Sequence, residues 1–409
     1  MTLGKPGKTL PAGNQTLLKR NNQLAITNYI IEHGPISRAD LSKRLKISKP
    51  TVSANVTELI EMNLLQEIGF CETDIGKKPM LVDFNKNVQY VLVLDFISYI
   101  SRGKVPIAVC NLYCEPIFID TIFLSPCFTG EEVRTVVTKT IRELFSQNKI
   151  VPEQVGKVVL TAPTVCYDEN HVPLECRNHE FINLAELFQP DFAGKIAVKN
   201  DINLAAIGEK HFGVGKEADN LFFVWAGLAV GGGLILNGEI YEGYTLYGGE
   251  LAFTTVYDTV LNKYMFLQDL TSMDGIRAYI AARKEAAAAS SIAKHLLDDT
   301  FYLDMMIEAA AQGDTFCLDF ARHVSQIFAS VIANITYTMN LQMVIIGGEY
   351  TGFGSLLVDE TRRILDSIPL PTPKVTTPFY TNSAMYGAFK FGACLLYTSP
   401  SPRDSTSCR

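Results

Sequence analysis

The stretch SRADLSKRLKISKPTVSANVTELI, residues 37–60, contains two helix-start signals separated by a short turn. Ser37 and Asp40 have capping-box spacing, because the Ser37 hydroxyl can accept from the amide three residues on while the Asp40 carboxylate reaches back. The first helix is expected to end near Leu45, with a turn at residues 46–47. Two capped helices joined by so short a turn predict a helix-turn-helix.

The second helix of this unit is expected to begin after Ser48, its N-cap. Pro50 is tolerated in the first turn because its missing amide has no helical partner there. An apolar face appears at helical spacing, formed by Val52, Val56, Leu59 and Ile60. Other positions carry short or basic side chains that suit a DNA groove. With Arg38 of the preceding helix, the predicted DNA-binding residues here are Lys49, Pro50, Thr51, Ser53, Asn55 and Thr57.

Residues 64–82 are typical of a two-stranded wing, and Lys77 and Lys78 at its tip are expected to touch phosphate. Charge agrees with DNA contact at this end, since residues 1–90 hold 12 Lys and Arg against 8 Asp and Glu, and the remainder holds 24 against 35. A three-helix protein-interaction domain is the alternative. The helix caps, the turn length, the polar face and the wing all agree, which favours a DNA-binding domain over a protein-interaction domain.

Bulk composition describes a soluble protein of two or three globular units, with 409 residues, 47% hydrophobic and 19% charged. No apolar run of 18 residues and no secretory signal occur, which predicts a cytoplasmic protein without a membrane partner. Nine cysteines are scattered singly, as reduced thiols would be. No paired cysteine motif suggests zinc, so neither a metal nor a cofactor is expected.

From residue 90 onward, the pattern predicts two α/β lobes. The first lobe has expected strands at 91–96, 105–112, 116–123 and 155–161, with a helix at 131–147. The second has expected strands at 195–199, 220–225, 231–236, 239–241 and 343–346, with helices at 205–212 and through much of 275–341. Carboxylates stand at strand ends in both lobes, which predicts a cleft for a small polar ligand between them.

The chain resembles transcriptional regulators of the ROK family (repressors, open reading frames and sugar kinases), related to xylose-, glucose- and N-acetylglucosamine-responsive repressors. The resemblance covers about residues 15–393. Its motifs are at 37–41, 49–53, 76–79, 200–201, 237–238, 249–250 and 347–348. It implies the α/β class, with a winged helix-turn-helix before a two-lobed, actin-like, hexokinase-type body that assembles as a homodimer or homotetramer.

The resemblance also implies a sugar-binding set, whose amides and carboxylates bond sugar hydroxyls: Asn178, Asn200, Asp201 and Glu250. Asp201 matches the general base of the family's kinases, and is read here as a relic. Simpler roles remain open for some members. Asn178 would then cap a turn, and Asp201 would cap the helix at 205–212.

Two departures from the family pattern argue against phosphate transfer. Bulky Phe96 and Ile97 follow Asp95 where the family has glycines, and the second phosphate loop reads Gly227-Leu228-Ala229. A degenerate nucleotide site is therefore expected at Asp95, Gly227, Gly347 and Gly348. The family's zinc motif is also broken, because Phe253 stands in place of its histidine. No catalytic residue is expected.

The function hypothesis is a regulator that binds double-stranded operator DNA and responds to a sugar or sugar phosphate, as a repressor of carbohydrate-utilisation genes. One alternative is an ATP-dependent sugar kinase with an accessory DNA-binding head. Another is a constitutive DNA-binding or scaffold protein with a vestigial cleft. Expected units are the head (1–87), the body (88–393) and a non-native, unstructured tail (394–409) that resembles a translated sequencing-library adapter.

Overall fold

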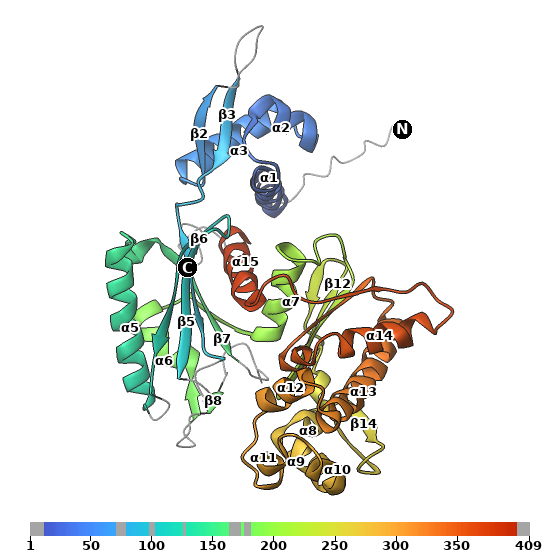
Figure 1. Ribbon diagram of the computed structural model, residues 1–409. Helices are drawn as coiled ribbons and strands as arrows, with labels where there is room; N and C mark the ends of the chain where they lie inside the picture. Colours follow the sequence, from blue (N-terminus) through green and yellow to red (C-terminus); the bar gives the residue numbers. More distant parts are fainter. Residues whose placement is uncertain are drawn as a thin grey trace, which may run out of the picture.

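The computed structural model describes residues 12–70, 79–97, 103–125, 128–162, 173–175 and 181–398. These residues form a head and two lobes, and the head (blue in Figure 1) stands beyond one end of the first lobe. The predicted α/β architecture, a winged helix-turn-helix before a two-lobed body, is confirmed.

Three helices and a small sheet make up the head: α1 (Ala12–His33), β1 (Ile36–Ser37), α2 (Arg38–Leu45), α3 (Lys49–Glu61), β2 (Leu65–Phe70) and β3 (Met80–Phe84). Both predicted caps form, since the hydroxyls of Ser37 and Ser48 accept from the amides of Asp40 and Thr51. The wing sheet has the order β1-β3-β2, so a short third strand joins the two predicted ones. The core of the head is apolar. Its buried residues include Ile26, Ile30, Leu41, Val52, Val56 and Leu59.

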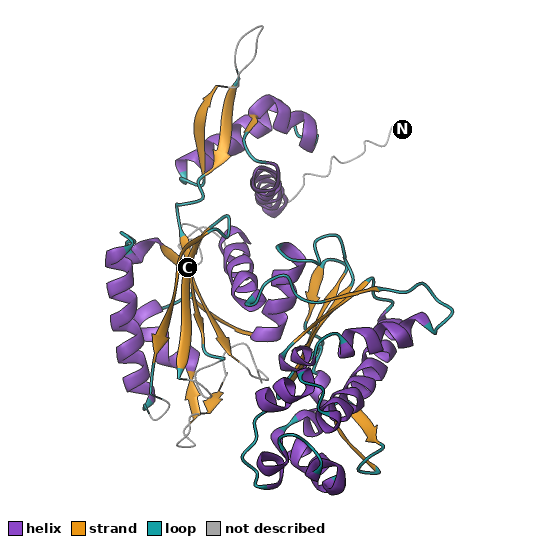
Figure 2. Ribbon diagram, in the orientation of Figure 1, coloured by secondary structure: helices purple, strands orange, loops and turns teal. Residues whose placement is uncertain are grey.

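The first lobe is built on a five-stranded sheet of order β10-β7-β4-β5-β6. Its strands are β4 (Tyr90–Asp95), β5 (Lys104–Asn111), β6 (Pro116–Phe123), β7 (Val155–Ala162) and β10 (Ile196–Asn200). The first three form an antiparallel meander, and β7 and β10 run parallel to β4. One face packs against α5 (Gly130–Gln147) and α6 (Leu184–Phe192), which Figure 2 shows on one side of the sheet. A small hairpin, β8 (Pro173–Glu175) and β9 (Phe181–Asn183), precedes α6.

A second five-stranded sheet, of order β13-β12-β11-β16-β17, forms the second lobe. Its strands are β11 (Leu221–Ala226), β12 (Val230–Leu236), β13 (Glu239–Tyr241), β16 (Met343–Gly347) and β17 (Lys374–Thr376). Its outer face packs on α8 (Leu267–Thr271), α9 (Met273–Ala282), α12 (Leu303–Ala311), α13 (Thr315–Met339) and α14 (Leu356–Asp366). Short helices α10 (Lys284–Ala288) and α11 (Ala293–Leu297) and a hairpin, β14 (Thr255–Asp258) with β15 (Lys263–Phe266), complete the lobe. No described helix is long and apolar enough to cross a membrane.

Two helices lie between the sheets and join the lobes: α7 (Asp201–His211) and α15 (Ser383–Thr398). Helix α15 packs on the first sheet at Val91 and Val93, and α7 packs on the second at Phe223 and Ile345. Figure 1 shows both helices side by side where the lobes meet.

The backbones of α7 and α15 touch at two glycines. A methyl group on Gly208 would overlap the carbonyl oxygen of Ser383, and one on Gly387 would overlap that of Leu204. Neither obstacle is a movable side-chain end, so both positions require glycine if the helices are to cross this closely.

One expectation about the tail is wrong. Helix α15 continues to Thr398, so residues 394–398 are helical, whereas the whole segment 394–409 was expected to lack structure. Leu396 also packs among apolar residues of the first lobe and the head. The physical reason is local, because no proline interrupts the helix before Pro400.

We predict that Gly387→Ala lowers the free energy of unfolding by about 1–3 kcal/mol or more, because the new methyl group must push two helix backbones apart. The measurement is thermal or denaturant unfolding of the purified protein. Gly352→Ala is the matched control, since its methyl group would meet only the side chain of Ile307, whose nearest atom would lie 3.0 Å away. Equal stability of the two variants would contradict the prediction.

Candidate functional site

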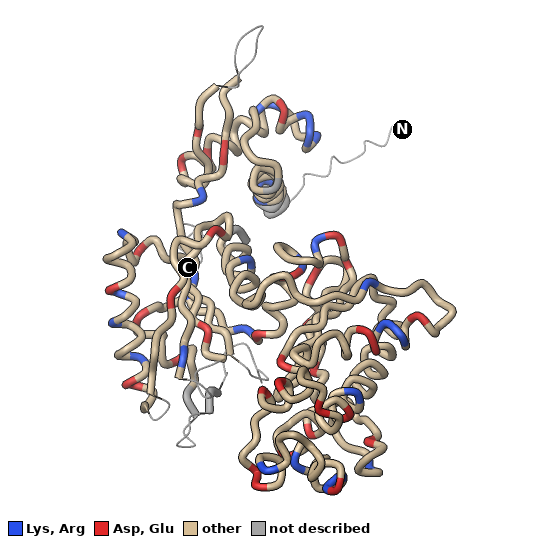
Figure 3. The backbone as a smooth tube through the Cα atoms, viewed as in Figure 1, with Lys and Arg blue, Asp and Glu red and all other residues tan. Residues whose placement is uncertain are grey.

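The exposed face of α3 contains most of the residues predicted to contact DNA. Lys49, Pro50, Ser53 and Thr57 are exposed, and Thr51 is half-buried. Figure 3 shows Lys and Arg at the outer end of α2. The head therefore presents short polar side chains bordered by positive charge, which suits entry into a major groove.

The expectation that Asn55 lies on this exposed face is wrong. Asn55 is 5% exposed, and its Nδ2 donates to the carbonyl oxygen of Thr51 at 2.8 Å. Helical spacing explains the difference, because Asn55 stands three residues after Val52 and four before Leu59, on the buried stripe. Residue type suggested a DNA contact where periodicity indicated the interior.

Arg38 is held within the head by side chains from two other elements. Its Nη1 donates to the hydroxyls of Ser53 at 3.3 Å and Thr57 at 3.0 Å. Its Nη2 forms an ion pair with Glu67 of β2 at 3.0 Å. Arg38 thus fixes α3 relative to the wing, and Glu67 is a partner that the sequence pattern did not indicate.

Three predicted site residues, Lys77 and Lys78 at the wing tip and Asn178 of the sugar-binding set, lie outside the described residues.

Three carboxylates from distant parts of the chain lie near one another where the two lobes meet. Asp95 ends β4, Asp201 begins α7, and Glu250 directly precedes a short 3-10 turn (Leu251–Phe253). Their proximity is electrostatic as well as spatial, because the charges of Asp95 and Glu250 both raise the pKa of Asp201. Three of the predicted residues therefore converge on one acidic site.

Burial, which removes the carboxylates from water, is the main cause of the raised pKa values in this cluster. It is the largest cause that raises the pKa of Asp201 to about 7, followed by the repulsion of Asp95. Burial likewise raises the pKa of Asp95, although hydrogen bonds from the Thr161 hydroxyl (2.6 Å) and the Ile97 amide (3.1 Å) oppose the shift. The pKa of Glu250 is also raised by burial. At neutral pH, Asp201 can then donate or accept a hydrogen bond, as sugar hydroxyls also do.

Asn200, rather than Asp201, is the N-cap of α7. The Asn200 Oδ1 accepts from the amides of Ile202 at 2.9 Å and Asn203 at 3.0 Å, and Asp201 is the first helical residue. The helix also starts four residues earlier than expected. Asn200 therefore takes the N-cap position that was one possible role of Asp201, and the Asp201 carboxylate belongs to the acidic cluster.

The two amides after Asp95 both bond within the chain. The Phe96 amide donates to the Thr161 carbonyl oxygen at 3.0 Å, and the Ile97 amide donates to the Asp95 carboxylate at 3.1 Å. Phe96 is fully buried and packs against Phe188, with ring centroids 5.8 Å apart. This backbone accordingly offers neither amide to a phosphate.

The second phosphate loop, residues 227–229, is a tight connection from β11 to β12 that a glutamine holds in place. The Gln268 Nε2 donates to the Leu228 carbonyl oxygen at 2.6 Å, and its Oε1 accepts from the Val230 amide at 2.9 Å. Gln268 of α8 therefore fixes the middle and the far end of the loop, by a contact that the sequence pattern did not indicate.

Phe253 packs on the β14–β15 hairpin, where its ring meets that of Phe266 edge-on with centroids 6.0 Å apart. Within the described ranges, no group of three or more His, Cys, Asp and Glu side chains is placed to hold a metal ion. The position where the resemblance implied a histidine is thus part of an aromatic contact.

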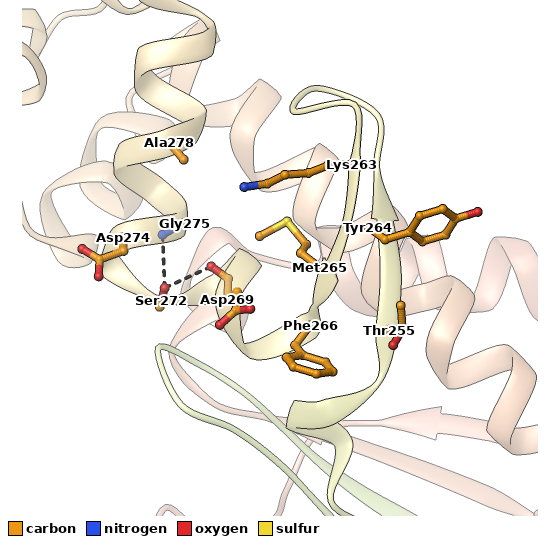
Figure 4. Close-up of a pocket in the computed structure, with 10 residues that line it drawn as sticks. All are labelled: Thr255, Lys263, Tyr264, Met265, Phe266, Asp269, Ser272, Asp274, Gly275 and Ala278. Carbon is orange, nitrogen blue, oxygen red and sulfur yellow. Dashed lines mark hydrogen bonds between the residues drawn. The ribbon is translucent and has the colours of Figure 1, made fainter.

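A separate hollow of about 620 Å³ lies between this hairpin and helices α8 and α9 (Figure 4). Lys263 and Met265 point into it from the hairpin, while Asp269, Ser272 and Asp274 border it from the helices. None of the predicted sugar-binding residues lines it. The acidic cluster, which includes Asp95 of the first lobe, is therefore distinct from this hollow in the second lobe.

We predict that Asp201 makes the protein less stable as pH rises from about 5 to 8. A folded-state pKa of about 7, above the ordinary 3.8, means that the folded protein holds an extra proton between these values and loses that advantage as pH rises through 7. Asp201→Asn should remove much of this fall, as measured by unfolding temperature at several pH values. The exposed Asp269→Asn serves as control, and parallel curves for wild type and Asp201→Asn would contradict the assignment.

Comparison with known proteins agrees with both parts of this structure. The model of the ROK family matches residues 126–396, and that of a winged helix-turn-helix DNA-binding domain matches residues 19–66. A xylose repressor of Caldicellulosiruptor bescii is 26% identical over 369 residues, covering 87% of this chain and 89% of that protein.

Solved structures show the same fold. A ROK family transcriptional regulator described as a homologue of the Escherichia coli MLC protein has a TM-score of 0.75 at 23% identity, covering 93% of this chain and 97% of that one. A ROK hexokinase from Thermus thermophilus has a TM-score of 0.58 at 15% identity, covering 76% of this chain and all of the enzyme. With its winged helix-turn-helix and a family match that covers more than half of its length, the chain belongs to the ROK family.

Proposed function

We propose that this protein is a sugar-responsive transcriptional repressor of carbohydrate-utilisation genes, with a DNA-reading head (1–87) and a sugar-receiving body (88–393). The observation that carries the proposal is the combination of the exposed polar face of α3 with the mutually close carboxylates Asp95, Asp201 and Glu250. The similarity to a xylose repressor supports it.

DNA recognition in this proposal depends on a pair of heads. Two copies of the chain would place two α3 helices in successive major grooves of a palindromic operator. Lys49, Thr51, Ser53 and Thr57 would face the bases or phosphates, with Pro50 beside them and Lys77 and Lys78 at the wing. Arg38 would act mainly by holding α3 in position, because Ser53, Thr57 and Glu67 already occupy its guanidinium group.

Sugar recognition would come from Asn178, Asn200, Asp201 and Glu250. Sugar hydroxyls both donate and accept, and a hydrogen bond to a charged group contributes about 1.5–3 kcal/mol. A sugar or sugar phosphate that prefers one arrangement of the lobes by about 1–3 kcal/mol would shift DNA affinity by the usual amount for allosteric coupling.

Phosphate transfer is not part of this proposal. It requires dense, preorganised donors around the transferred group. The amides of Phe96 and Ile97 are bonded within the chain, and Gln268 fixes the loop at 227–229. We infer that Asp95, Gly227, Gly347 and Gly348 are remnants of a nucleotide site.

A sugar kinase with a DNA-binding head is the second candidate, and one observation favours it. The pKa of Asp201, about 7, suits a general base at neutral pH. A coupled assay of ADP release over a panel of hexoses and pentoses separates the two candidates. Turnover with any sugar would support the kinase, and its absence in a preparation that responds to sugar on DNA would support the repressor.

We predict that Lys49→Ala weakens binding to the protein's own upstream intergenic DNA and lowers the salt dependence of binding by about one unit of slope, because one phosphate contact is lost. Lys77→Ala is expected to act in the same way. Electrophoretic mobility shift at several salt concentrations measures both effects. Lys284→Ala, an exposed lysine on the second lobe, is the control and should leave binding unchanged.

Asp201→Ala is expected to leave DNA affinity intact while abolishing the sugar response, because the mutation removes a cleft carboxylate and leaves the head untouched. The same mobility-shift experiment, with sugars and sugar phosphates added, measures it. Sugar-dependent release by Asp201→Ala equal to that of the wild type would disprove the cleft assignment.

A further inference from the structure

The connection after β16 presses against the end of β11. These strands are parallel neighbours, with Trp225 paired to Gly347. Gly348 follows with a φ of +100°, and a methyl group there would overlap the carbonyl oxygen of Ala226. A left-handed glycine is thus required for the chain to turn so closely over the strand end. The next residue, Glu349, begins a 3-10 turn (Glu349–Phe353).

This turn places the Glu349 carboxylate directly against Gly227, the first residue of the second phosphate loop. A methyl group on Gly227 would overlap the Glu349 Oε2 and would lie 3.0 Å from the indole nitrogen of Trp225. Gly227 itself is buried. The place where a glycine would let a phosphate approach the backbone is therefore occupied by an acidic group of the chain.

Within the part of the chain that the structure describes, the Glu349 carboxylate has no hydrogen-bond or ion-pair partner, and the residue is exposed to solvent. Its negative charge is consequently not neutralised by a neighbour and acts on whatever approaches the loop. Coulomb repulsion between like charges in contact is substantial even near a protein surface.

We propose that Glu349 is a built-in anion that excludes nucleoside polyphosphates from the loop at 227–229. The inference extends the proposed function, in which the body receives a sugar without transferring phosphate. Bulky Phe96 and the bonded amides at 96–97 remove attraction for phosphate at one loop. Glu349 supplies active repulsion at the other, and Gln268 keeps that loop from rearranging away from it.

The test is isothermal titration of the full chain with inorganic tripolyphosphate and with ADP, comparing wild type with Glu349→Gln. Glutamine keeps the size of the side chain and removes only its charge. We expect the variant to bind both ligands at least about tenfold more tightly than wild type, with a difference that shrinks as salt is raised. Glu285→Gln, which removes an exposed charge elsewhere on the second lobe, should match wild type.

Each contrary result overturns the inference. Equal affinity of wild type and Glu349→Gln for tripolyphosphate would show that the carboxylate does not exclude anions. An equal gain in Glu285→Gln would assign the effect to net charge. Adenosine, which has no phosphate, should not distinguish wild type from Glu349→Gln, and a gain with adenosine would indicate steric blocking. Sugar-dependent DNA release by wild type is scored separately, so failure of the proposed function remains distinguishable.

Discussion

The contact on which the two-lobed body depends is the crossing of α7 and α15 at Gly208 and Gly387. Each helix covers one sheet, so the distance between the helix backbones sets the distance between the lobes. Glu209, fully buried on α7, strengthens the same contact. Its Oε1 accepts from the Phe379 amide at 3.0 Å and the Ser383 hydroxyl at 2.5 Å, which fixes the start of α15. The close approach of the α7 and α15 backbones and the hydrogen-bonded, buried carboxylate of Glu209 together determine how the lobes meet.

The acidic cluster of Asp95, Asp201 and Glu250 depends in part on this crossing. Asp201 is the first residue of α7, so its position is set by the helix whose other turns contact α15. Asp95 ends β4 and Asp201 follows β10 in the same sheet of the first lobe, so these two carboxylates are neighbours at one sheet edge. Glu250 comes from the second lobe and could not approach Asp201 if the lobes stood further apart. The raised pKa of Asp201 is thus a property of the tertiary contact, since its causes are burial and carboxylates distant in sequence.

Local signals in the sequence predicted local structure well. The caps at Ser37 and Ser48 and the turn between α2 and α3 depend on neighbouring residues, and both caps are confirmed. Family resemblance, rather than periodicity, pointed to Asp201 and Glu250. Features that depend on partners distant in the sequence were not predicted. Examples are the ion pair of Arg38 with Glu67 and the hydrogen bonds of Gln268 with the loop at 227–229. The β14–β15 hairpin was missed too, because its four-residue strands carry little alternating pattern.

The way in which a ligand bound between the lobes would change DNA binding depends on how the head is attached to the body. The chain passes from β3 into β4 within six residues, and the turn between β5 and β6 holds this passage. Tyr113 donates to Asp83 at 3.1 Å, and Lys86 pairs with Glu115 at 2.7 Å. Since these contacts join the head to the first lobe, a ligand that closes the cleft would move the second lobe against head and first lobe together. In the proposed dimer, the spacing of the two heads would then change only if the second lobe takes part in the contact between copies.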